Sequence, residues 1–239
     1  MSKSWIIARR ELREYFDSPT AYIVVVSFLA IAGWMFFSSL FLSGQADMRS
    51  FFAPSIFSPS MLLTIIVPAL TMRLVAEERK SGTIELLTTL PIRDSEVILG
   101  KFLGALGLLT IGLAVTVIYA VGISSLGALD WGPVIAGYTG LFLFTAAMVA
   151  IGVLCSTVTD NQIVAFIISF IVCSGLYFIY YLQFFLPQEV AKIVEYISIS
   201  AHLDNLARGV IDSRDVMYYL SLTAGALLLA IRSLSRQHA

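Results

Sequence analysis

The sequence is poor in charge and poor in cysteine. Only 13% of its 239 residues are Asp, Glu, Lys or Arg, whereas soluble domains carry about 25%. Hydrophobic residues make up 58%, and the mean hydropathy is +0.88. These values predict an integral membrane protein. Its two cysteines, Cys155 and Cys173, both lie in apolar runs. We therefore expect two small buried side chains rather than a disulfide framework or a metal cluster.

Long runs without charge indicate six membrane-spanning helices, each of which needs about 20 mainly apolar residues. The last run, Val216 to Ile231, is short. It reaches span length only if the helix starts near Asp212 and Arg232 snorkels towards the interface. The sequence thus predicts an all-α integral membrane protein with a single transmembrane domain over residues 1–239. The expected spans are residues 20–42, 54–75, 99–125, 133–157, 162–186 and 213–234.

The second of these spans contains three prolines, Pro54, Pro59 and Pro68. Proline removes a backbone donor and kinks a helix. We expect this span to start after Pro54 and to bend near Pro68. The bend is either a hinge that transmits movement or ordinary tolerance of proline in a membrane helix.

The basic residues predict the orientation of the spans. Eleven of the 15 lie in the N-terminal segment, the loop at 73–101 and the C-terminal tail. Only Arg49, Lys192, Arg208 and Arg214 lie on the other side. By the positive-inside rule, both termini and the 73–101 loop are expected in the cytoplasm.

Two segments outside the spans have helical patterns. Residues 2–17 alternate apolar side chains, such as Trp5 and Tyr15, with Arg and Glu, as in an amphipathic helix that lies in the membrane interface. Residues 187–212 form a non-cytoplasmic loop with two apolar-periodic pieces, Val190–Ile199 and Leu203–Ile211. Asp212 and Asp215 fit the N-cap and N3 positions of the last span.

The loop between spans two and three carries the most distinctive pattern, AEERKSGTIELLTTLP from Ala76 to Pro91. The spacing of Arg73 and Glu77 predicts that span two continues as a charged helix beyond the membrane. Ser81 and Gly82 break that helix. A second, short helix over residues 83–90 then follows, with four large aliphatic side chains. These either lie on the bilayer interface or fill a groove on a soluble partner.

The stretch EERKSGTIELLTTLPIRDSEVILGKFLG, Glu77 to Gly104, resembles the cytoplasmic loop of ABC-2 class permeases, the type V exporter fold. That pattern has an acidic-basic helix end, Gly-Thr-x-Glu-Leu-Leu, a proline, and an acidic residue before Gly-Lys at the start of the third span. The matching residues are Glu78, Gly82, Thr83, Glu85, Leu86, Leu87, Pro91, Glu96, Gly100 and Lys101. Within the class, Ala201–Leu222 resembles the outer loop and sixth helix of the compact permease of gliding-motility-associated transporters.

The resemblance implies one half of a transporter in a bacterial inner membrane, with lipid around it and no nucleic acid partner. The sequence has no Gly-x-x-x-x-Gly-Lys-Ser/Thr phosphate loop. The resemblance therefore implies that ATP and Mg²⁺ are bound by two separate ATPase subunits, and no cofactor by this chain. A second permease is either identical or a different chain with a large periplasmic domain. The residues expected to dock the ATPase or couple to it are Glu77, Glu78, Arg79, Lys80, Gly82, Thr83, Ile84, Glu85, Leu86, Leu87 and Pro91.

Other functions remain open at this point. A secondary transporter or ion channel usually places ionisable residues inside its spans, and no span core contains one here. A subunit that uses ATPase strokes mechanically and transports nothing would have the same sequence features. A membrane-embedded hydrolase lacks a histidine cluster, paired intramembrane carboxylates and a nucleophile elbow. Nothing polar inside the spans specifies a substrate.

Two clusters have alternative interpretations. Aromatic residues of span five form either an exit path or an ordinary aromatic belt at the interface. They are Tyr177, Phe178, Tyr180, Tyr181, Phe184 and Phe185. Small residues of span three allow close helix packing, either within the chain or between permeases. They are Gly104, Ala105, Gly107, Gly112 and Ala114.

Overall fold

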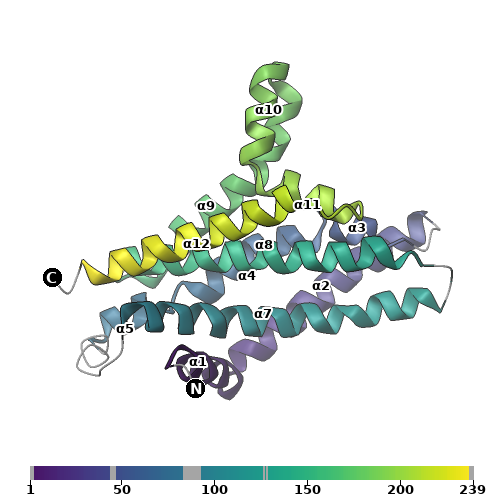
Figure 1. Cartoon of the computed structure of the whole chain (residues 1–239). Helices are drawn as coiled ribbons and strands as arrows, with labels where there is room; N and C mark the ends of the chain where they lie inside the picture. The colour runs from purple at the N-terminus through teal and green to yellow at the C-terminus, as the bar shows by residue number, and fades with distance from the viewer. Residues whose placement is uncertain (1–2, 44–46, 83–92, 126, 128, 237–239) are drawn as a thin grey trace.

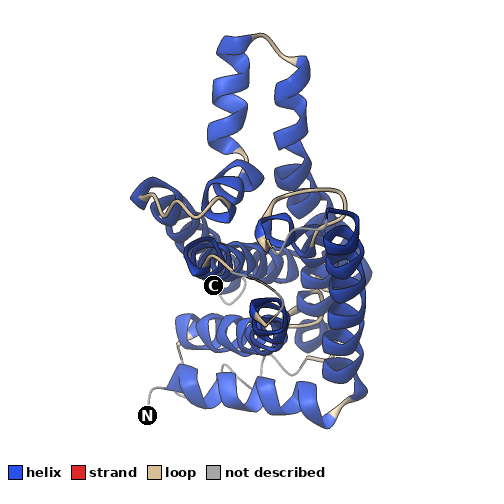
Figure 2. Ribbon diagram, turned by 90° about the vertical axis from the view of Figure 1, so that its right-hand side faces the viewer, coloured by secondary structure: helices blue, strands red, loops and turns tan. Residues whose placement is uncertain are grey.

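The structure is a computed structural model that describes residues 3–43, 47–82, 93–125, 127 and 129–236. The described residues form helices, turns and loops (Figure 2). Six helices are long and apolar enough to cross a membrane, which confirms an all-α membrane protein with six spans. The elements in chain order are α1 (Lys3–Asp17), α2 (Pro19–Ser43), α3 (Arg49–Phe52), α4 (Pro59–Thr71), α5 (Ala76–Lys80), α7 (Asp94–Ser124), α8 (Trp131–Val158), α9 (Gln162–Leu182), the 3₁₀ helix η1 (Gln183–Phe185), α10 (Gln188–Ile197), α11 (Ile199–Ala207) and α12 (Ser213–Ser235).

Helix α8 is the centre of the bundle. Most of its side chains are buried, and α4, α7, α9, α11 and α12 all pack on it. Glycines let these neighbours approach closely: a Cβ at Gly140 would lie 2.9 Å from Leu206 Cβ of α11. Small residues at helix crossings have this role in membrane bundles, where close packing drives association.

Helix α1 runs across the long helices rather than along them (Figures 1 and 2). Its buried residues are Ala8, Glu11 and Tyr15, and it packs mainly on α7. Trp5 and Ile6 are on its exposed face, 54% and 57% accessible. The N-terminal helix is therefore amphipathic, and its apolar outer residues stay available to the membrane interface.

The second span differs from the sequence-based expectation at both ends. Its helix begins at Pro59, not after Pro54, because α3 and a non-helical stretch at 53–58 come first. The Ser58 side chain accepts a hydrogen bond from Met61 N and caps α4, with Pro59 at the first helical position. The helix then ends at Thr71, three residues after Pro68.

The expected continuation of span two as a charged helix is found, but it is interrupted: the span-length segment Pro59–Lys80 contains both α4 and the charged helix α5. Turns at residues 72–75 separate α4 from the charged helix α5. The cause is a tertiary contact. Ser156 Oγ of α8 accepts hydrogen bonds from Val75 N and Ala76 N, and it donates to Met72 O. A side chain thus replaces the intrahelical partners of these backbone groups.

The remaining helix ends shift by a few residues. Helix α7 starts at Asp94, five residues before the expected start at 99. Its cap is the Glu96 carboxylate, which accepts from Arg93 N at 2.9 Å. At the other end of the bundle, Asp212 caps α12 as expected, accepting from Arg214 N at 2.9 Å.

The expected outer loop contains two helices, α10 and α11, with different surroundings. Ser198 ends α10 and caps α11, where the sequence pattern placed the second piece only from Leu203. Helix α11 is buried against α8 and α9, whereas α10 has no buried residue. The outer end of α9 and α10 form a hairpin that stands clear of the other helices (Figures 1 and 2).

Candidate coupling site at the basic end of the bundle

The basic end of the bundle is the end that holds α5 and the C-terminus (Figure 1). Helix α5 contains only Ala76–Lys80, too few residues to be stable alone. It is fixed by its neighbours instead. Ser156 of α8 binds its first turn, as described above, and Ala76 is fully buried. The chain leaves α5 through Gly82, whose φ of 70° favours glycine.

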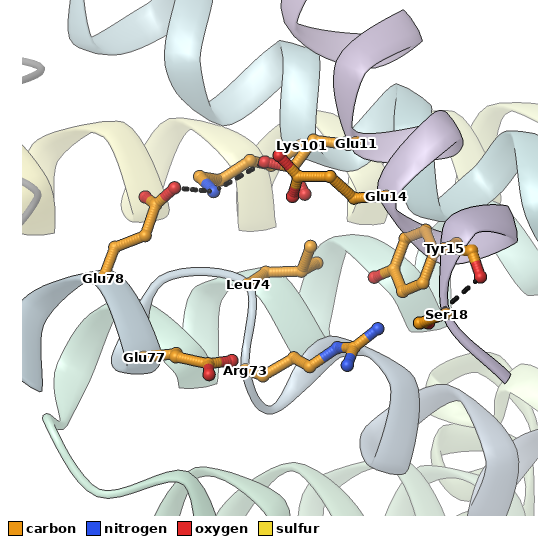
Figure 3. Close-up of a pocket in the computed structure, with 9 residues that line it drawn as sticks. All are labelled: Glu11, Glu14, Tyr15, Ser18, Arg73, Leu74, Glu77, Glu78 and Lys101. Carbon is orange, nitrogen blue, oxygen red and sulfur yellow. Dashed lines mark hydrogen bonds and ion pairs between the residues drawn. The ribbon is translucent and has the colours of Figure 1, made fainter. Parts of the chain in front are cut away.

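A buried ion cluster joins α5 to α1 and α7. Lys101 Nζ lies 2.9 Å from Glu11 Oε1 and 2.8 Å from Glu78 Oε1 (Figure 3). The three side chains are 3%, 8% and 17% accessible. Two carboxylates therefore share one ammonium in a site with little water. Arg10 Nη2 of α1 also lies 3.8 Å from Glu78 Oε1. Loss of the shared cation would leave two buried negative charges facing each other.

A polar cavity of about 250 Å³ opens beside this cluster (Figure 3). Its lining residues come from α1, from the 72–75 turns, from α5 and from α7. They are Glu11, Glu14, Tyr15, Ser18, Arg73, Leu74, Glu77, Glu78 and Lys101. The cavity is thus walled by the same elements that the ion cluster joins.

Tyr15 and Arg73 close the far side of the cavity. The Arg73 guanidinium carbon lies 5.0 Å from the centroid of the Tyr15 ring, a cation–π distance. Burial raises the pKa of the Tyr15 phenol well above its ordinary value, so the hydroxyl stays protonated. It donates to Leu70 O at 3.4 Å, at the end of α4. Arg73 therefore contacts α1, where the sequence had suggested a helical pair with Glu77.

Arg79 fixes the opposite side of α5. Its Nε lies 2.8 Å from Asp160 Oδ1, and its Nη1 donates to Thr157 O at 2.8 Å. Both partners lie where α8 ends and α9 begins. One arginine thus ties the start of the loop to the connection between two spans.

Close packing of α1 on α7 depends on two glycines. A Cβ at Gly100 would lie 2.6 Å from Ile7 Cβ, and one at Gly104 would lie 2.6 Å from Glu11 Cβ. Contacts below 3.0 Å require the neighbouring helix to move. Of the alternatives for the small residues of span three, the structure shows packing within the chain at these positions. The glycine before Lys101 therefore lets α1 approach the ion cluster.

The structure brings only part of the expected docking set together. Glu78 and Arg79 turn inward to the contacts above, Glu77 lines the cavity, and Lys80 is exposed. Gly82 is the last described residue of the loop before residue 93. The expected helix at 83–90 and the following proline lie outside the described residues. They carry the other six members, Thr83, Ile84, Glu85, Leu86, Leu87 and Pro91.

Sequence reasoning missed the partners of these charges. Glu11, Ser156 and Asp160 were not candidates, although they bind Lys101, α5 and Arg79. One signal was available for Glu11. It lies among the apolar positions of α1, at the same helical face as Tyr15, four residues later. Ser156 and Asp160 carried no comparable signal, because only the packing of α8 brings them to α5.

Comparison with known proteins identifies the family. The model of the ABC-2 family transporter proteins matches residues 43–231. The chain belongs to this family. No match was found among curated proteins. The ABC-2 match begins after α1 and includes α5, Lys101 and all later spans. This ABC-2 family protein is accordingly the membrane subunit of an ABC transporter, and Glu11 supplies its ion cluster from outside the matched region.

Proposed function

We propose that the chain is the permease subunit of an ABC export complex, driven through the 73–101 loop by separate ATPase subunits. The substrate leaves from the cytoplasm or the inner leaflet. The membership in the ABC-2 family supports the role of membrane subunit. The fixed base of the loop supports the coupling route.

The observation that carries the proposal is the ion cluster, which joins the two ends of the loop. Glu78 lies just before residues 83–90 and Lys101 just after them, and the two are joined at 2.8 Å. A force applied to the segment between them would reach α5 and α7 together. Glu11 extends the same contact to α1, and Arg79 extends it to the start of α9. Such a base moves several helices at once, which coupling requires.

The docking surface itself is proposed from the sequence. Ile84, Leu86 and Leu87 are the anchors that would enter a groove on the ATPase, because anchors carry most of an interface's energy. Glu77 and Lys80 remain as polar contacts at the rim. Glu78 and Arg79 hold the base of the loop, so their part in docking is indirect.

The assembly is proposed to contain two ATPase subunits, which bind ATP and Mg²⁺, and a second permease. The resemblance of Ala201–Leu222 favours a gliding-motility-associated system, in which the second permease is a different chain with a large periplasmic domain. The chain is proposed to lie in a bacterial inner membrane. Its two termini and the loop are on the cytoplasmic side, as the distribution of basic residues predicts.

Co-expression with a candidate ABC ATPase from the same genome tests the proposal. We expect the two chains to purify together, with ATP hydrolysis only when the ATPase is present. Hydrolysis of ATP by the isolated chain, or a chain that never retains an ATPase, would contradict it. Labelling of a cysteine at residue 81, but not at residue 191, by an impermeant reagent outside intact cells would contradict the orientation.

A further inference from the structure

A second basic feature of the structure lies at the C-terminal end of α12. Arg232, Ser233 and Arg236 line a cavity of about 440 Å³ together with Leu154 of α8 and Leu229 of α12. The cavity lies at the basic end of the bundle, where α12 finishes (Figure 1). It is separate from the polar cavity beside Lys101, with which it shares no lining residue.

The two guanidinium groups have no carboxylate partner among the described residues. Among the described residues, the arginines that form ion pairs are Arg10, Arg79 and Arg208, and neither Arg232 nor Arg236 is among them. The nearby Asp94 carboxylate accepts from Ser235 Oγ at 2.8 Å. Both arginines are exposed, and they lie four residues apart, on one face of the last turns. Two positively charged side chains thus line one cavity, and neither forms an ion pair with a described carboxylate.

The floor of the cavity is apolar, and part of it belongs to a membrane-spanning helix. Leu228 and Leu229 are 58% and 53% exposed within a helix that is long and apolar enough to cross a membrane. Leu229 precedes Arg232 by three residues, which is about 4.5 Å along the helix axis. The cavity therefore has an apolar part, formed by Leu154 and Leu229, and a cationic part nearer the C-terminal end of α12.

We propose that this cavity binds an anionic phospholipid of the inner leaflet, which rests on the membrane orientation proposed above. The phosphate lies between Arg232 and Arg236, with Ser233 beside it, and the upper part of one acyl chain lies against Leu154 and Leu229. Arginine suits this role because its planar group gives paired hydrogen bonds to phosphate oxygens. Basic pockets between membrane helices on the cytoplasmic side commonly hold anionic headgroups.

The apolar floor favours a lipid over a soluble protein partner. A cytoplasmic protein could meet the two arginines, but Leu229 lies deeper along a membrane-spanning helix. A lipid has a charged headgroup that can meet the two arginines and an acyl chain that can meet the two leucines. A soluble phosphate compound would use the arginines alone and would leave the leucines uncovered.

Native mass spectrometry of the whole chain tests this assignment. Phosphatidylglycerol and phosphatidylcholine with the same acyl chains serve as probes. We expect phosphatidylglycerol to be retained more strongly. The double variant Arg232→Gln/Arg236→Gln should lower that retention about tenfold or more, since each basic residue near an anionic surface contributes roughly a fivefold factor in affinity. Phosphatidylcholine retention should not change. Arg214→Gln, at the other end of the same helix, is the matched control and should behave as wild type.

A second variant keeps both charges and fills the cavity. Leu229→Trp should also lower phosphatidylglycerol retention, and it leaves the positive charge that orients the helix in place. The assignment is wrong if the double variant retains phosphatidylglycerol as wild type does. It is equally wrong if Leu229→Trp has no effect, or if glycerol 1-phosphate displaces the lipid at equal concentration. Loss of a co-purifying ATPase from the double variant, with lipid retention unchanged, would make the cavity a protein-docking surface instead.

Discussion

The two ends of the bundle hold their non-helical connections by different chemistry. At the basic end, ion pairs hold α5 and the 72–75 turns in place, chiefly those of Lys101 with Glu11 and Glu78. At the opposite end, the stretch at 53–58 is tied down by hydroxyl groups. Tyr177 lies in α9, and its hydroxyl is 3.1 Å from both Ser58 Oγ and Ser60 Oγ and donates to Ser55 O at 2.9 Å.

The opposite end also contains a buried ionisable pair. His202 Nδ1 lies 2.6 Å from Asp215 Oδ1, and its Nε2 lies 3.1 Å from Tyr196 O. This pair joins the end of α10 to α11 and α12 and carries a net ionic bond only when the histidine is protonated. The permanent buried charges are therefore concentrated where α5, α1 and α7 meet.

The difference predicts different responses to single substitutions. A neutral hydroxyl network that loses one member can keep its remaining hydrogen bonds, at a cost of about 1 kcal/mol. A buried ion cluster that loses its central cation leaves two carboxylates facing each other, at a cost of several kcal/mol. The basic end is accordingly rigid as long as Lys101 is present. This is what the proposed transmission of force through the loop requires.

Lys101→Met should have the largest effect. It removes the cation shared by Glu11 and Glu78, so we expect a loss of about 3–5 kcal/mol in the free energy of unfolding. Thermal unfolding in detergent measures it, with Lys80→Met on the exposed side of α5 as the control. A triple variant that adds Glu11→Gln and Glu78→Gln should recover most of the loss. Wild-type stability of the single variant would show that the cluster is not buried.

Gly104→Ala tests the crossing of α1 over α7. The new methyl group would meet Glu11 Cβ at 2.6 Å and force α1 away, at a cost of about 1–3 kcal/mol. Gly122→Ala lies in the same helix with nothing within 4 Å. It should be neutral or stabilise by up to about 1 kcal/mol, because alanine favours helix. Equal melting temperatures for the two variants would contradict the close approach of α1.

Ser156→Ala tests the anchoring of α5. The substitution leaves the buried amides of Val75 and Ala76 without their acceptor, at a cost of about 1–3 kcal/mol. Hydrogen exchange should show the largest increase at these two amides, and little at α9. Unchanged protection of both amides would mean that another group can accept from them.

Tyr177→Phe is the corresponding test at the opposite end. Ser58 and Ser60 would remain hydrogen-bonded to each other at 2.8 Å, so we expect a loss of only about 1 kcal/mol. Thermal unfolding under the same conditions as for Lys101→Met gives the comparison. A loss as large as that of Lys101→Met would remove the distinction between the two ends.

Arg79→Gln should have the smallest effect on stability. Its partner Asp160 is 66% accessible, and exposed ion pairs contribute about 0.2–1 kcal/mol. The bond to Thr157 O can be partly replaced by the glutamine amide. A double-mutant cycle with Asp160→Asn isolates the pair, and a coupling energy above about 2 kcal/mol would contradict its surface character.

The sequence predicted the spans well and their ends less well. Charge-free runs locate α2, α8 and α12 because lipid allows few alternatives to a helix. The break between α4 and α5 was not predictable, since it depends on Ser156, 80 residues away from Ala76. The same holds for the ion cluster. Glu78 and Lys101 were both among the residues that match the ABC-2 loop pattern, but only the crossing of α1 over α7 shows that they meet Glu11.

The central claim is that the basic end receives the ATPase through the loop between α5 and α7. Leu87→Asp places a carboxylate at a proposed anchor, and a buried unpaired carboxylate costs several kcal/mol. Co-purification of the ATPase at matched expression should therefore be lost, whereas Thr88→Asp, on the proposed polar flank, should retain it. Retention of the ATPase and of transport by the Leu87 variant, with loss of both in the Thr88 variant, would contradict the assigned faces. If both variants retain the ATPase, the loop is not the docking site.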